Sequence, residues 1–124
     1  MLVGLYIIVD EDFDRPVHAD PDAEELDPEL WDAGVEALQD AFDDEGPAQG
    51  CVEVAEHWVA WKLHVKMGVA FLAIVSDDVS AADVKSYLKL VHKAYFDEVD
   101  DARNPDRDGV ADVLIDVVAP WEDV

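Results

Sequence analysis

The residues of this chain that could do chemistry are four histidines, a single cysteine and a few hydroxyl groups. Their spacing matches none of the common catalytic patterns, since GxSxG, HExxH, CxxC, GxGxxG and the phosphate-binding GxxxxGK are all absent from the sequence. The sequence therefore indicates neither a nucleophile activated by a neighbouring base nor a phosphate-binding loop. We expect that the protein is not an enzyme and that it uses no cofactor.

Metal binding is also not favoured by the spacing of the possible ligands. His57 and His64 are seven positions apart, which places them on opposite faces of a continuous strand. The acidic clusters at 10–14 and 97–101 lack the glycine and terminal glutamate of an EF-hand loop. We therefore expect no metal site. The alternative is a small enzyme or a ligand- or metal-binding domain with a pocket near His64 and His92.

The lysines form the most distinctive pattern. All five lie within residues 62–93, a window with a charge of +2 in a chain whose net charge is −23. Lys85, Lys89 and Lys93 are four positions apart and would form a line along one helix. They could cover apolar surface or pair with acids elsewhere, or they could receive an acidic partner. The candidate partner-binding residues are Lys62, Lys66, Lys85, Lys89, Lys93 and Trp58, the last as an interface anchor if it is exposed.

The overall composition narrows the environment and the partners. The chain has 31 acidic and 8 basic residues, a balance that disfavours nucleic acid and anionic membranes as direct partners. Asp is abundant and Lys is scarce, as in proteins of salt-accumulating archaea, where salt screens the repulsion between carboxylates. With one cysteine and no signal-peptide pattern at the start of the chain, we expect a cytoplasmic protein without a disulfide and without membrane insertion.

The 124 residues read as a single domain, 1–124, of α+β class. Apolar runs and alternation predict five strands, whereas caps and helical spacing predict two helices. Residues 110–118 fit both a helix and a strand, and we favour a C-terminal helix. The wholly apolar strands should lie at the centre of a mostly antiparallel sheet, the polar ones at its edges, and helices on both faces. The predicted strands are 2–9, 17–19, 51–56, 59–65 and 69–75, and the predicted helices are 28–45 and 80–99.

This order of elements resembles the longin and roadblock superfamily of small profilin-like domains. The resemblance is carried by LYIIVDEDFDRPVHA at 5–19, PELWDAGVEALQDAFDDE at 28–45, VAWKLHVKMGVAFLAIVSDD at 59–78 and SAADVKSYLKLVHKAYFDEV at 80–99. It implies a non-enzymatic interaction platform that forms a homo- or heterodimer through an edge strand or its first helix. The implied partner is a protein, such as a small Ras-like GTPase or a trafficking-like complex. A purely structural homo-oligomer is a further alternative.

Overall fold

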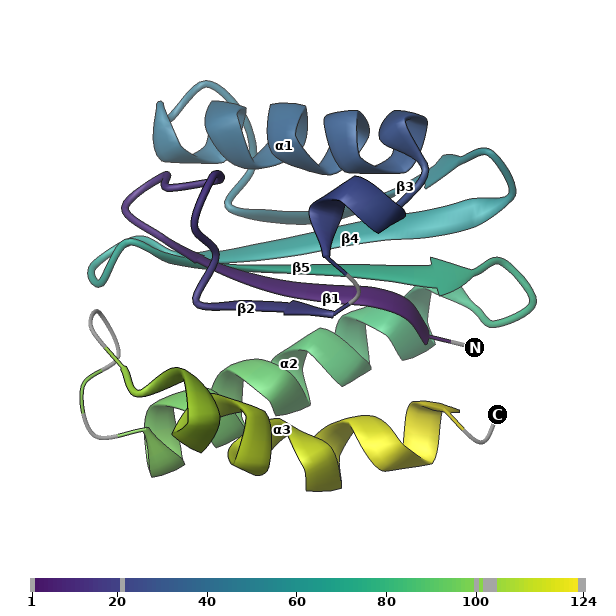
Figure 1. The fold of residues 1–124 in the computed structure, drawn as a ribbon. Coiled ribbons are helices and arrows are strands. Elements are labelled where there is room, and N and C mark those ends of the chain that lie inside the picture. Colours follow the sequence, from purple (N-terminus) through teal and green to yellow (C-terminus); the bar gives the residue numbers. More distant parts are fainter. Residues whose placement is uncertain (1, 21, 100, 102–104, 123–124) are drawn as a thin grey trace.

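The computed structural model of the protein describes residues 2–20, 22–99, 101 and 105–122, with the backbone alone at 23, 107 and 116–122. Strands and helices follow the predicted order, and a short 3-10 helix, η1, is added before the first α-helix (Figure 1). In chain order the elements are β1 Leu2–Val9, β2 His18–Asp20, η1 Ala23–Glu25, α1 Pro28–Phe42, β3 Gln49–Val54, β4 His57–His64, β5 Val69–Ser76, α2 Ala81–Glu98 and α3 Arg107–Glu122.

The five strands form one sheet in the order β2-β1-β5-β4-β3, and every neighbouring pair is antiparallel. The apolar runs that we expected at the centre are β1 and β5, which pair along nearly their whole length. The expected edge strands are β2 and β3. The predicted α+β fold with a five-stranded antiparallel sheet is therefore confirmed, and so is the arrangement of its strands.

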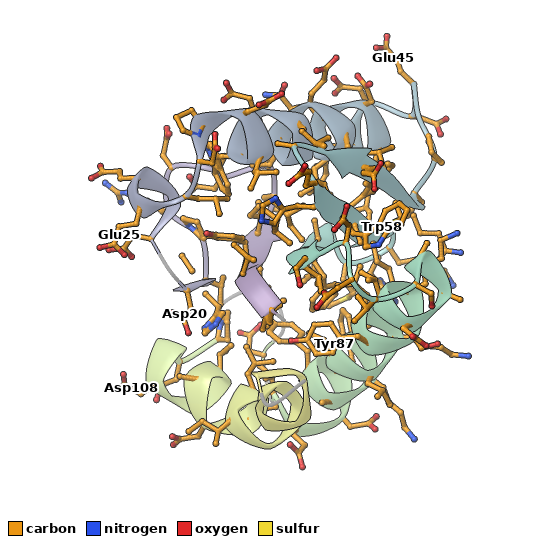
Figure 2. All side chains as sticks on the ribbon, turned by 90° about the vertical axis from the view of Figure 1, so that its right-hand side faces the viewer. Asp20, Glu25, Glu45, Trp58, Tyr87 and Asp108 are labelled. Carbon is orange, nitrogen blue, oxygen red and sulfur yellow. The ribbon has the colours of Figure 1, made fainter. Side chains whose placement is uncertain are left out.

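Helices cover both faces of the sheet. In Figure 1, α1 lies on one face, and α2 and α3 lie side by side on the other. Two apolar clusters result because residues of β1 alternate between them: Leu5 and Ile7 belong to the cluster under α2 and α3, whereas Tyr6 and Ile8 belong to the cluster under α1. In Figure 2, the buried Tyr87 points from α2 toward the sheet.

Helices α1 and α2 begin where the sequence predicts. The Asp27 carboxylate accepts a hydrogen bond from the Glu29 N–H at 3.0 Å, and Pro28 occupies the first turn of α1. The Ser80 hydroxyl accepts a hydrogen bond from the Asp83 N–H at 3.2 Å at the start of α2. Each cap satisfies a backbone donor that the helix itself leaves unpaired.

The close approach of α1 to the sheet depends on a glycine. A Cβ atom at Gly34 would lie 2.6 Å from Cδ2 of Leu72, a residue of the central strand β5. The absence of a side chain therefore lets the helix pack closely against Leu72.

The predicted bounds of three elements were wrong by two or three residues at one end or at both ends. Helix α1 ends at Phe42 rather than at residue 45, because Asp44 adopts a left-handed conformation with φ 58°. Strand β3 covers 49–54 rather than 51–56, since Ala55 and Glu56 form a tight turn with φ values of 49° and 64°. Strand β4 covers His57–His64 rather than 59–65, and Val65, in the turn that follows, is 72 % exposed.

The C-terminal segment is a helix, as we favoured. Helix α3 is longer than expected, running over Arg107–Glu122, and it packs against α2. Val110 and Leu114 are buried in the cluster beneath the two helices. Their spacing of four residues is close to one turn of a helix, and because it is even it also fits one face of a strand. The sequence alone was therefore ambiguous at this segment.

Candidate functional site

Strand β3 forms an open edge of the sheet. It pairs with β4 on one side, and the register places Gln49 opposite Lys62. The Leu63 N–H donates to the carbonyl of Ala48 at 2.7 Å. In an antiparallel pair, hydrogen-bonded and non-bonded pairs of residues alternate, so Gln49, Cys51 and Glu53 are in non-bonded pairs with β4. The backbone groups of three β3 residues therefore point away from the sheet: Gln49, Cys51 and Glu53.

A groove of about 310 Å³ lies beside this edge, between the β3–β4 pair and helix α2. Three lysines contribute to its lining: Lys62 from β4, and Lys85 and Lys89 from α2. Leu88 supplies an apolar side chain, and Ser86 and Gln49 supply polar ones. The fold thus gathers three of the five lysines around one groove.

The groove lysines have no carboxylate partner among the residues that the structure describes. Within the described part of the chain, no salt bridge within 4.0 Å or hydrogen bond joins Lys62, Lys85 or Lys89 to an acidic side chain. Lys85 and Lys89 are also exposed on α2. Pairing with acids elsewhere on the domain, which was one explanation of the lysine pattern, therefore does not account for these three among the residues described.

Two neighbouring groups sense the positive charge of the groove. Burial raises the pKa of the Cys51 thiol, and the Lys85 ammonium group offsets part of that rise. Burial lowers the pKa of His92, and the charges of Lys62 and then His64 lower it further. In both cases the ammonium group of a nearby lysine, Lys85 for Cys51 and Lys62 for His92, acts to lower the pKa.

Two of the candidate lysines lie outside the groove. Lys93 is exposed one turn after Lys89 on α2, and it does not contribute to the lining. Lys66 lies in the turn between β4 and β5, so it is not on the strand that carries Lys62. Four-residue spacing placed Lys93 in the same line as Lys85 and Lys89 but could not show where the groove ends.

The position of Trp58 differs from that of an exposed anchor. Its side chain is half-buried and packs against the cluster under α2. The indole N–H donates to the carbonyl of Val79 at 2.8 Å, which ties the start of β4 to the loop before α2. Figure 2 shows Trp58 at the end of α2 that lies under the β3–β4 hairpin. Trp58 therefore ties β4 to the loop before α2, and it does not project as an exposed interface residue.

Sequence reasoning missed the five other lining residues, which are Gln49, Gly50, Trp61, Ser86 and Leu88. Gln49 was excluded because we placed the start of the strand at residue 51. Ser86 and Leu88 lie within the predicted helix, but only the rotation of α2 about its axis brings them to the groove. The one available signal was that Ser86 and Leu88 are the sequence neighbours of Lys85 and Lys89.

The two histidines of the alternative hypothesis pack against each other. The rings of His64 and His92 stack with centroids 5.4 Å apart, and Phe96 lies 4.6 Å from His64. The Met67 N–H donates to Nδ1 of His64 at 3.3 Å. Neither histidine lines the groove or the second cavity described below. Their contacts fit a packed aromatic cluster better than a ligand-binding pocket.

The acidic clusters do not converge on a metal-binding geometry. Among the residues that the structure describes, no group of three or more His, Cys, Asp or Glu side chains could hold a metal ion. Asp100, a member of the predicted cluster at 97–101, lies outside the described residues. In Figure 2, the labelled carboxylates of Glu25, Glu45 and Asp108 point away from the core.

A second cavity, of about 560 Å³, lies at the opposite side of the sheet. Phe13, Leu26 and Trp31 contribute apolar surface, and its charged lining residues are all carboxylates, such as Asp22 and Glu24. Acids lie on most of this protein's surface, so the carboxylates at this cavity do not distinguish it from the rest of the molecule.

Comparison with known proteins gives no information on the site. No protein-family model, curated protein or solved structure matches the chain. Among the described residues, no helix has the length and apolar character needed to cross a membrane. The groove beside β3 is therefore the candidate site on structural grounds alone.

Proposed function

We propose that the protein is a non-enzymatic interaction module that binds an extended segment of another protein along β3. An incoming strand would use the outward backbone groups of Gln49, Cys51 and Glu53, the mode known as sheet extension. The longin and roadblock resemblance suggests a small Ras-like GTPase or a trafficking-like complex as the source of that segment. The acidic composition supports a saline cytoplasm as the setting, in an archaeon-like host.

A single observation carries this proposal: lysines without an acidic partner among the described residues lie beside an open sheet edge. An exposed edge is normally protected, because its unpaired N–H and C=O groups invite other chains. Lysines on an edge can serve that protection, but these lie on the neighbouring helix and strand and line a groove. In a chain of net charge −23, three unpaired cations at one place suit the binding of a partner better than general repulsion.

The test compares two substitutions at one exposed edge residue. Glu53→Pro removes an outward N–H without removing a bond to β4, and proline is tolerated on edge strands. Glu53→Thr removes the same carboxylate and keeps the N–H. Both variants and the natural chain are used as bait in native lysate at molar KCl, and captured proteins are quantified by mass spectrometry. Circular dichroism verifies that each bait is folded.

We expect one set of proteins to be captured by the natural chain and by Glu53→Thr but lost with Glu53→Pro. A small GTPase in that set would support the more specific assignment. Equal capture by all three baits would show that β3 is not the binding edge. Recovery of the bait alone would contradict the proposed function.

A further inference from the structure

We propose that the groove selects a partner strand with acidic residues at every second position and apolar residues between them. This inference rests on the proposed sheet extension along β3 and adds the chemistry of the segment that binds there. It follows from the different character of the two faces beside that edge, which an added strand would meet with alternate side chains.

The face toward α2 favours acidic side chains. Residues directly opposite each other on neighbouring strands place their side chains on the same face. Cys51 faces the cluster under α2, so Gln49 and Glu53 share that face. Partner residues opposite these three would therefore project toward the groove, where the unpaired Lys85 and Lys89 lie. Carboxylates at these positions can form charge-assisted hydrogen bonds with the two ammonium groups.

The face toward α1 favours apolar side chains. Val52 is 42 % exposed at the edge, and Val54 packs against the cluster under α1. Helix α1 has no basic residue and carries exposed acids such as Glu36 and Asp40. A partner carboxylate on this face would meet like charges, whereas an apolar side chain would cover Val52. The alternation of acidic and apolar residues is thus set by the two helices.

A second copy of this chain is a poorer occupant than an acidic segment. Antiparallel pairing of two β3 strands centred on Cys51 would bring two sets of groove lysines to one face of the joined sheet. Each strand would offer only Glu53 as an acid on that face, because its other two residues there are Gln49 and Cys51. Repulsion between the lysines would remain largely uncompensated.

The inference is tested with capped synthetic peptides and the purified full chain. One peptide of six residues alternates Glu and Val, and a second has three Glu followed by three Val. The two have equal charge and composition, but only the first can direct all its acids to one face. Binding is measured by NMR titration in molar KCl, where screening limits the general repulsion by the acidic surface to ~3 Å.

Two lysine variants complete the design. Lys85→Glu combined with Lys89→Glu reverses the charge of the groove, whereas Lys93→Glu makes the same change on the same helix outside it. We expect the alternating peptide to bind roughly tenfold more tightly than the block peptide. The double variant should bind the alternating peptide roughly tenfold more weakly than the natural chain does, because it loses two charge pairs of ~0.7 kcal/mol each. The Lys93→Glu variant should bind within about twofold of the natural chain.

The inference is wrong if both peptides bind equally, if neither binds, or if Lys93→Glu weakens binding as much as the double variant. Concentration-dependent protection of β3 without peptide would identify a second copy as the occupant and also overturn it. These failures differ from failure of the proposed function. Capture that is lost with Glu53→Pro but unchanged in the lysine double variant would leave β3 as the binding edge and reject only the acidic segment.

Discussion

The two edge strands of the sheet differ in length and in the charge beside them. Strand β2 is three residues long and has carboxylates around it, whereas β3 is six residues long and has lysines beside it. At the β2 edge, Asp20 belongs to the strand itself, and the adjacent cavity is lined by Asp22 and Glu24. Helix α3 also contacts β2. At the β3 edge, the outward backbone groups lie beside a groove with three cations.

The β2 edge is protected against pairing with other chains, whereas the β3 edge is available for it. A short edge strand surrounded by like charges repels other acidic chains and offers few hydrogen bonds. A longer edge with unpaired cations does the opposite for an acidic segment. The net charge of −23 therefore does not describe all parts of the surface equally, because the β3 side departs from it. The predictions below test whether the two edges differ in this way.

The largest expected effect is that of salt on the acidic side of the molecule. Transfer from molar to low KCl should lower the free energy of unfolding by about 2 kcal/mol or more, because repulsion between carboxylates is no longer screened. Hydrogen exchange should show that amides of β2 lose protection before amides of β4. Unfolding in denaturant, measured by circular dichroism at several salt concentrations, gives the total effect. Equal stability at low and high salt would show that the acids do not repel enough to matter.

A second prediction concerns the turn that joins the β3 edge to the sheet. Ala55 and Glu56 both have positive φ, although Asn-Gly is the sequence preferred for such two-residue turns. Replacing the pair by Asn-Gly should raise the free energy of unfolding by about 1 kcal/mol. Glu56→Gln removes the charge and keeps the strained conformation, so it should change stability little. A similar gain with Glu56→Gln would assign the effect to charge.

This turn illustrates what the sequence could not reveal. The apolar runs of β1 and β5 and the caps at Asp27 and Ser80 predicted the sheet centre and both helix starts, because burial and capping leave local patterns. Ala55 and Glu56 carry no turn signal, so both strand ends at this hairpin were misplaced.

The candidate site was predictable only in part, for a related reason. The four-residue spacing identified Lys85 and Lys89, but the end of the groove before Lys93 depends on how α2 crosses the sheet. The sequence could not show that Trp58 is half-buried, because its hydrogen-bond partner, Val79, is 21 residues away. Contacts of this kind are set by tertiary packing, which a single sequence does not encode as a local pattern.

The smallest expected effect is the pH dependence of stability, which we expect from His18 in β2 and His92 in α2. Burial lowers the pKa of His18 in β2, although Asp20 acts in the opposite direction. Burial, Lys62 and His64 all lower the pKa of His92 below its usual 6.5. Because the unfolded chain then binds more protons in acid, stability is highest above pH 6.5 and falls as the pH drops through the folded pKa values.

The two histidines can be separated by one substitution. Lys62→Gln should raise the pKa of His92 toward 6.5 and leave that of His18 unchanged, because only His92 senses the groove. The associated change in stability should be below about 1 kcal/mol, since a shift of one pKa unit corresponds to ~1.4 kcal/mol. NMR titration of the imidazole C–H signals provides the measurement. An unchanged His92 pKa would show that the groove charge does not reach the aromatic cluster.

The central claim, that β3 is an open and available edge, is tested most directly by amide hydrogen exchange of the purified chain. The experiment is performed by NMR in molar KCl at two protein concentrations, without any partner. We predict fast exchange at Gln49, Cys51 and Glu53 and slow exchange at Val52 and Val54, whose N–H groups face β4. Slow exchange at all five positions at the lower concentration would contradict the account, because the edge would already be covered.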